Sequence, residues 1–205
     1  MIEAGETQLP PQAPPANVVD IIKDKSGRLH ELVDGPRPDL VEQLVALSGS
    51  DPGTMKFTRD SERFASTEAF DTWHEERDVL WMTHEEQLSG VIFFGPKQPS
   101  LDILLPVVTT NPHTMGIRVY DGYSANGLGT QLMNVGHWHY LEKFAPADEP
   151  DLIWVESQHD NPAVGMYERF GYKPYAFDNG SGTSLMYLPL NAQVAHPDFK
   201  PQIIT

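Results

Sequence analysis

One heptapeptide decides the fold of this chain: Ser124-Ala125-Asn126-Gly127-Leu128-Gly129-Thr130. An apolar-rich run, 115–120, precedes it, and apolar residues at helical spacing follow from Leu128 onward. This order predicts a strand, a glycine turn and a helix. The first N–H groups of a helix have no acceptor within the helix, and the helix dipole favours anions there. We therefore expect the turn to bind a phosphate-bearing ligand.

A second segment, 160–172, predicts a short helix with well-marked ends. Asp160 or Asn161 is a suitable N-cap, because a short polar side chain can accept from the first N–H groups. Pro162 fits the first helical position, and Gly171 fits the position just after the helix. Tyr167 lies inside this helix.

The charge balance excludes one class of partner. The chain has 29 acidic and 14 basic residues and a formal charge of -15. Binding along a phosphate backbone needs clustered lysine and arginine, so we expect no nucleic-acid partner. The same field would attract a cationic amine substrate, although a high net charge also keeps a protein soluble.

The 205 residues suffice for one domain with a normal hydrophobic core. We expect this domain at 17–190, after a proline-rich extended arm, 1–16, and before a C-terminal tail, 191–205. The arm or the tail could pack on a second copy in a homodimer. There is no cysteine, no apolar run of membrane-spanning length and no signal-peptide pattern, so we expect a cytoplasmic protein without a membrane partner.

Apolar periodicity predicts the remaining elements. We expect strands at 18–22, 79–82, 88–94, 115–120, 152–155, 172–177 and 184–188, the second and third forming one hairpin and the last two another. We expect helices at 40–47 and from Ser66 or Thr67 to Arg77 or Asp78. The prolines in 97–113 predict an irregular segment that could border a pocket.

These features resemble the GNAT superfamily of acyl-CoA-dependent N-acetyltransferases. Its turn motif is Arg or Gln, two residues, Gly, one residue, then Gly or Ala, and Gly127 with Gly129 fits it. The other matching residues are Val119, Ala163, Tyr167, Gly171 and Tyr172. Two positions depart from the pattern. Ser124 stands where the family has Arg or Gln, and Asp160 stands where it commonly has Asn, with Asn161 one residue later.

The resemblance implies an α/β (α+β) fold with a mixed, mostly antiparallel twisted sheet flanked by helices, and acetyl-CoA as the acyl donor. The residues that it assigns to coenzyme A are Val119, Ser124, Asn126, Gly127, Leu128, Gly129, Thr130 and Asn161. It makes Tyr167 the acid that protonates the departing thiolate. It offers His113 and Glu156 as alternative bases that deprotonate the amine, and water relays or the absence of a dedicated base remain open.

The acceptor stays open, because nothing in the sequence separates a small amine or polyamine from an aminoglycoside or a protein amine. Glu75, Glu76 and Asp78 could line an amine entrance, since the second helix commonly borders the acceptor site in this superfamily. His137 and His139 are two residues apart and point to different faces of a helix, so we expect no metal site there.

Two other functional classes remain as alternatives. A non-catalytic acyl-CoA sensor or interaction module of the same fold is favoured by Ser124 and by the displaced Asn161. A nucleotide-dependent transferase with a phosphate-binding turn is disfavoured, because the chain has neither a P-loop nor a Gly-x-Gly-x-x-Gly fingerprint.

Overall fold

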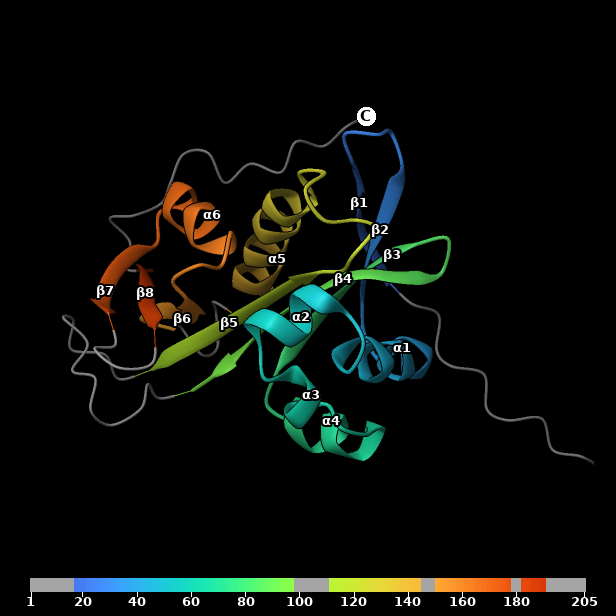
Figure 1. The fold of residues 1–205 in the computed structure, drawn as a ribbon, viewed down its shortest axis with the longest axis horizontal. Coiled ribbons are helices and arrows are strands. Elements are labelled where there is room, and N and C mark those ends of the chain that lie inside the picture. The colour runs from blue at the N-terminus through green and yellow to red at the C-terminus, as the bar shows by residue number, and fades with distance from the viewer. Residues whose placement is uncertain (1–16, 98–110, 145–149, 178–181, 191–205) are drawn as a thin grey trace, which may run out of the picture.

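The computed structural model describes residues 17–97, 111–144, 150–177 and 182–190. In this part of the chain one eight-stranded sheet runs in the order β1-β2-β3-β4-β5-β6-β8-β7 (Figure 1). The strands are β1 (Asn17–Lys23), β2 (Leu29–Asp34), β3 (Asp78–His84), β4 (Gln87–Pro96), β5 (Pro112–Val119), β6 (Leu152–Gln158), β7 (Lys173–Phe177) and β8 (Thr183–Pro189). The helices are α1 (Pro38–Ser48), α2 (Pro52–Phe57), α3 (Asp60–Arg63), α4 (Thr67–His74), α5 (Leu128–Phe144) and α6 (Ala163–Phe170).

Neighbouring strands are antiparallel throughout the sheet except for β5 and β6, which are parallel. A parallel pair needs a crossover connection, and α5 lies in the connection between β5 and β6. This arrangement confirms the mixed, mostly antiparallel sheet flanked by helices that the sequence predicted.

The helices cover the two faces of the sheet separately (Figure 1). On the face of α5 and α6 the core includes Ile117, Leu132 and Tyr167. On the face of α1 and α4 it includes Leu44 and Phe70. Because successive side chains of a strand point to opposite faces, the central strands β2, β3 and β4 contribute to both cores. A fully buried leucine or phenylalanine side chain, such as Leu132 or Leu44, contributes about 1.5–3 kcal/mol.

Most predicted elements are confirmed, with ends that shift by a few residues. The helix predicted from Ser66 or Thr67 ends at His74 instead of Arg77 or Asp78, because Asp78 already begins β3. Three elements were not predicted: β2, α2 and α3. The two helices are short, and α2 depends on a local cap, since the Asp51 carboxylate accepts from Thr54 N at 3.1 Å.

Several predictions fall outside the described residues. These are the proline-rich arm, the C-terminal tail and most of the segment 97–113; its last two residues, Pro112 and His113, belong to β5. Within the described ranges, no helix combines the length and the apolar character that crossing a membrane requires.

Candidate functional site

The parallel strands β5 and β6 are paired at one end only. Their register begins where Pro112 meets Leu152 and ends where Thr114 meets Trp154, although both described strands continue for several residues. The strands therefore separate toward their C-terminal ends and leave an opening in the sheet. Backbone groups along this opening are available to a ligand, because the neighbouring strand does not use them.

The glycine turn lies at the C-terminal end of β5, at the edge of this opening. Gly127 has a φ of +81°, a left-handed conformation that glycine adopts without strain, and α5 begins at Leu128. Among the described residues, the backbone N–H groups of Gly127, Leu128 and Gly129 have no recorded acceptor. The turn thus combines free N–H groups with the positive end of a 17-residue helix, which favours a phosphate group.

Gly129 brings together the three segments that carry the sequence motif. A Cβ atom on this residue would lie 3.2 Å from Met166 Sδ of α6 and 3.8 Å from Val119 Cγ2 of β5. The missing side chain lets α6 and the end of β5 approach the first turn of α5. The remaining predicted residues of the turn have exposed or half-buried side chains: Ser124, Asn126 and Thr130.

The cap of α6 differs by one residue from the prediction. Pro162 occupies the N-cap position instead of the first helical position, and Asn161 Oδ1 accepts from Ala163 N at 2.9 Å. Asn161 still provides the side-chain cap, because an asparagine can bond the backbone two residues on. Asp160 instead forms an ion pair of 3.0 Å with Lys56 of α2. Gly171 ends the helix with a φ of +110°, as predicted.

Tyr167 lies on α6 with its ring buried and 6% of its surface exposed. Burial raises the pKa of Tyr167, and the nearby Arg118 cation opposes this rise. The preceding residue, Met166, lies against Gly129 in the first turn of α5, so this part of α6 lies beside the opening. The Tyr167 hydroxyl is not among the enclosed polar atoms without a partner, and no hydrogen bond from it is recorded in the described residues. The hydroxyl therefore reaches accessible space.

The two candidate bases lie in different surroundings. Glu156 is exposed on the separated part of β6 and shares a sheet face with Trp154, opposite to α5. Its Oε1 accepts from Thr183 Oγ1 at 3.4 Å. His113 is buried at the paired end of β5 and contacts Tyr140 of α5. The structure thus brings Glu156 to the opening, whereas His113 and the glycine turn lie at opposite ends of β5.

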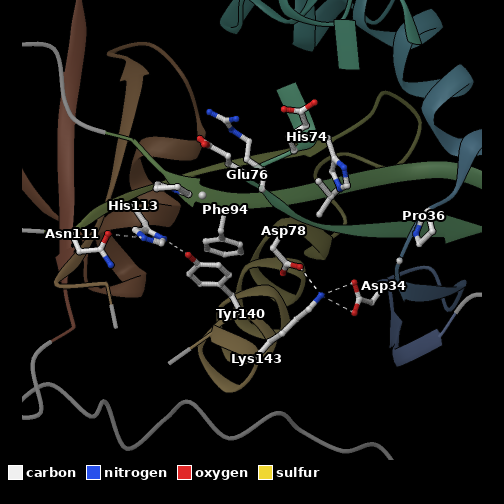
Figure 2. Close-up of a pocket in the computed structure, with 16 residues that line it drawn as sticks. Asp34, Pro36, His74, Glu76, Asp78, Phe94, Asn111, His113, Tyr140 and Lys143 are labelled. Atoms are coloured by element: carbon white, nitrogen blue, oxygen red, sulfur yellow. Dashed lines mark hydrogen bonds and ion pairs between the residues drawn. The ribbon is translucent and has the colours of Figure 1, made fainter. Parts of the chain in front are cut away.

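Figure 2 shows the surroundings of His113. Its Nδ1 is hydrogen-bonded to the Tyr140 hydroxyl, and its Nε2 lies 3.2 Å from Asn111 Oδ1. These residues line a cavity of about 610 Å³ at the end of the sheet away from the glycine turn. Glu75, Glu76 and Asp78, predicted to border an amine entrance, line this same cavity.

Lys143 neutralises part of the acidic wall of this cavity (Figure 2). Its Nζ donates to Asp78 Oδ1 at 2.7 Å and to Asp34 Oδ2 at 3.0 Å. These carboxylates raise the pKa of Lys143 although burial lowers it. His139 Nε2 lies 3.4 Å from Asp34 Oδ2, whereas His137 is fully buried and points elsewhere. The two histidines therefore have separate partners.

One charged pair beside the site was missed by sequence reasoning. Arg118 donates to both oxygens of Asp60, from Nε at 2.6 Å and from Nη2 at 3.0 Å. Asp60 is fully buried and also pairs with Arg63 Nη1 at 3.1 Å. The carboxylate raises the pKa of Arg118 against the effect of burial. Asp60 and Arg118 are 58 positions apart in the sequence, so no local sequence pattern predicts the contact between them.

Comparison with family models and with curated proteins found no match. Solved structures do match. The GNAT domain of S. lividans PAT is 12% identical over 85% of this chain and 97% of that one, with a TM-score of 0.57. RimL, a ribosomal L7/L12 α-N-protein acetyltransferase, is 12% identical over 89% of this chain and 99% of its own, also with a TM-score of 0.57.

A GNAT-family acetyltransferase of Streptococcus pneumoniae is 17% identical over 78% of this chain and all of its own, with a TM-score of 0.53. RimL has also been solved in complex with coenzyme A. The chain therefore has the GNAT fold. Sequence identities of 12–17% show the fold alone.

Proposed function

We propose that this protein is an N-acetyltransferase that moves an acetyl group from acetyl-CoA to a primary amine by direct attack. The observation that carries the proposal is the opening between β5 and β6, bounded by the glycine turn and by Tyr167. The free N–H groups of the turn fit a diphosphate, and the unpaired edge of β5 fits a pantetheine arm. Bound acetyl-CoA would supply the thioester carbonyl that the amine attacks.

Within this reaction, Tyr167 donates its proton to the departing thiolate sulfur. Its raised pKa keeps the hydroxyl protonated at neutral pH, so the acid is ready in nearly every molecule. The neutral amine attacks: the new bond joins its nitrogen to the acyl carbon, the carbon–sulfur bond breaks, and the nitrogen loses one proton. An acceptor that arrives as an ammonium ion loses a further proton before the attack. Tyr167 then regains a proton from solvent, which its accessible hydroxyl allows.

We propose Glu156 as the group that accepts the proton from the amine. The carboxylate is exposed and lies on the separated part of β6, where an acceptor can approach from the α1–α4 face. His113 remains the second candidate. Both of its ring nitrogens have a hydrogen-bond partner at the paired end of the strands, which favours Glu156.

The acceptor is proposed as a primary amine that arrives as a cation, since the chain carries a formal charge of -15. Small amines, polyamines, aminoglycosides and protein amines all fit this description. A protein N-terminus gains support from the similarity to RimL, which is an α-N-protein acetyltransferase. We further propose that the protein acts in the cytoplasm.

Two measurements in sequence test the proposal. Acetyl-CoA at about 100 times its Kd should stabilise the folded protein by about 2.7 kcal/mol, which raises Tm. Release of free thiol is then followed across a panel of polyamines, aminoglycosides, amino acids and peptides with free N-termini. No stabilisation by millimolar acetyl-CoA would refute every reading based on coenzyme A.

Tyr167→Phe should lower kcat about 100-fold and leave the Kd for acetyl-CoA unchanged. Tyr120→Phe is the matched control, because the Tyr120 hydroxyl is enclosed without a partner and cannot touch a ligand. An unchanged kcat in Tyr167→Phe would remove the acid role.

A non-catalytic acyl-CoA sensor is the second candidate, and the observation that favours it is Ser124, which lacks the long side chain of the family motif. Binding of acetyl-CoA without thiol release for any amine on the panel would support the sensor and exclude the enzyme.

A further inference from the structure

The β1–β2 hairpin leans onto the glycine turn, although the two segments are about one hundred residues apart in sequence. Lys25 N donates to Asn126 O at 3.2 Å, and Arg28 Nη2 donates to Gly122 O at 3.2 Å. The Arg28 guanidinium also lies 5.0 Å from the centre of the Tyr123 ring. The hairpin is therefore a third wall of the proposed diphosphate site, beside β5 and α6.

A buried carboxylate fixes the shape of this hairpin. Asp24 accepts from Ser26 N at 2.8 Å, from Ser26 Oγ at 2.7 Å, from Arg28 N at 2.9 Å and from Arg28 Nε at 2.7 Å. Burial alone would raise the pKa of Asp24, but these hydrogen bonds hold it well below its usual value. Gly27 completes the turn with a φ of +93°. The position of the intervening Lys25 is thus set by its own loop.

The Lys25 side chain lies along the glycine turn. Its Cε is 3.5 Å, and its Cγ 3.9 Å, from the point where a Cβ of Gly127 would stand. A carbon–nitrogen single bond is about 1.45 Å long, so the ammonium lies within about 5 Å of that point. Lys25 is exposed and forms no recorded ion pair with any described residue. A positive charge therefore stands unneutralised at the turn.

Arg28, the neighbouring cation, is less available than Lys25 to bind an anion at the glycine turn. Arg28 is held by Asp24 Oδ2 at 2.7 Å and by Gly122 O, and its remaining face covers Tyr123. Ser124, which stands at the Arg or Gln position of the family motif, offers only a short hydroxyl. The turn thus lacks a long polar side chain of its own, and Lys25 approaches it from another part of the fold.

We propose that Lys25 binds the diphosphate of coenzyme A and takes the place of the long side chain that is missing at Ser124. This inference rests on the proposed function, since it assigns a further binding residue to the same site. Lysine suits the role because its ammonium is a compact charge on a flexible stem and can follow phosphate oxygens. The charge also offsets, locally, the repulsion that a strongly acidic protein exerts on an anionic ligand.

The test is a calorimetric titration of the whole protein with coenzyme A and with 3′-dephospho-coenzyme A. Lys25→Met should weaken the binding of both ligands about tenfold, as expected for one charge-assisted contact at an exposed site. The loss should shrink in about 1 M salt, where the Debye length is about 3 Å. Lys173→Met, the same change in an exposed lysine of β7 at the other edge of the sheet, should bind like the wild type.

A rescue variant separates a charge effect from a local distortion. Adding Ser124→Arg to Lys25→Met should restore affinity, because it puts a cation back at the turn from the family's own position. Unchanged affinity in Lys25→Met overturns the assignment. A loss confined to coenzyme A would place Lys25 on the 3′-phosphate and also overturn it. A wild-type protein that binds neither ligand refutes the proposed function instead.

Discussion

His137 should make the protein less stable as the pH falls from about 6.5 to about 4. The ring is fully buried on α5. Its Nδ1 lies 2.7 Å from Met133 O, an acceptor, so Nδ1 carries the proton and donates. Its Nε2 lies 2.8 Å from the Tyr172 hydroxyl and accepts from it in the neutral ring. A second proton on Nε2 would reverse this bond, so that Nε2 donates to the Tyr172 hydroxyl, and would place a charge in the core.

The size of the effect follows from the pKa. Burial lowers the pKa of His137 from 6.5 to about 4, although the Met133 carbonyl opposes this. Throughout this window the unfolded chain therefore binds a proton that the folded chain does not bind. The free energy of unfolding decreases as the pH decreases. At about 1.4 kcal/mol per pKa unit, the loss amounts to about 3 kcal/mol once the pH is below about 4.

The assay is urea denaturation at a series of pH values, applied to the wild type and to His137→Gln. Glutamine keeps one donor and one acceptor but does not titrate. Burial also lowers the pKa of His30 and of His74, and these contributions cancel in the difference between the two proteins. The stability advantage of the wild type should therefore shrink between about pH 7 and about pH 4. A constant difference, or an NMR titration of the His137 ring near 6.5, would refute the reasoning.

Three further predictions concern the site. Glu156→Gln should lower kcat/KM about 100-fold, whereas His113→Asn should leave it unchanged, both measured by thiol release. A large loss in His113→Asn and none in Glu156→Gln would make His113 the base. Arg118→Met should destabilise the protein by about 3 kcal/mol in urea, since it leaves buried Asp60 with an incomplete set of cations. Asp60→Asn in the same background should recover part of that loss, and an additive loss would contradict a paired role. Gly127→Ala should cost about 1 kcal/mol because the residue has a positive φ, and an unchanged urea midpoint would count against strain there.

The parts of the site that sequence reasoning predicted depend on local signals. Gly127 and Gly171 both have a positive φ, which glycine adopts without strain, in a turn and at a helix end respectively. Each conformation involves only neighbouring residues, so the sequence near it predicts it. The alternation of apolar runs with turn residues likewise predicted seven of the eight strands. The strand that was missed, β2, exposes the apolar Leu29 and buries the polar His30. At these two positions the side chains are therefore buried or exposed against their hydrophobicity.

The parts that could not be predicted are contacts between distant segments. Lys25 is one of 14 basic residues in the sequence, and nothing near it indicates that the hairpin docks on Gly127. The Arg118–Asp60 pair depends in the same way on where α3 crosses β5. The offset of the α6 cap depends on one backbone angle at Pro162, which both helical and flanking positions allow. Such features follow from the assembled sheet and helices, and local sequence does not encode them.

Cationic side chains lie near the opening, although the protein as a whole is acidic. Lys97 lies 5.3 Å from the Trp154 ring, and its pKa is lowered first by burial and then by Arg63, Arg77 and Arg59, while Glu156 raises it. Several cations thus lie near the α1–α4 side of the opening in a protein with a formal charge of -15. Nearby cations disfavour a protonated amine. Under the proposed function, the acidic far field would gather a cationic acceptor, and the cations near the opening would help it lose a proton before it attacks the thioester.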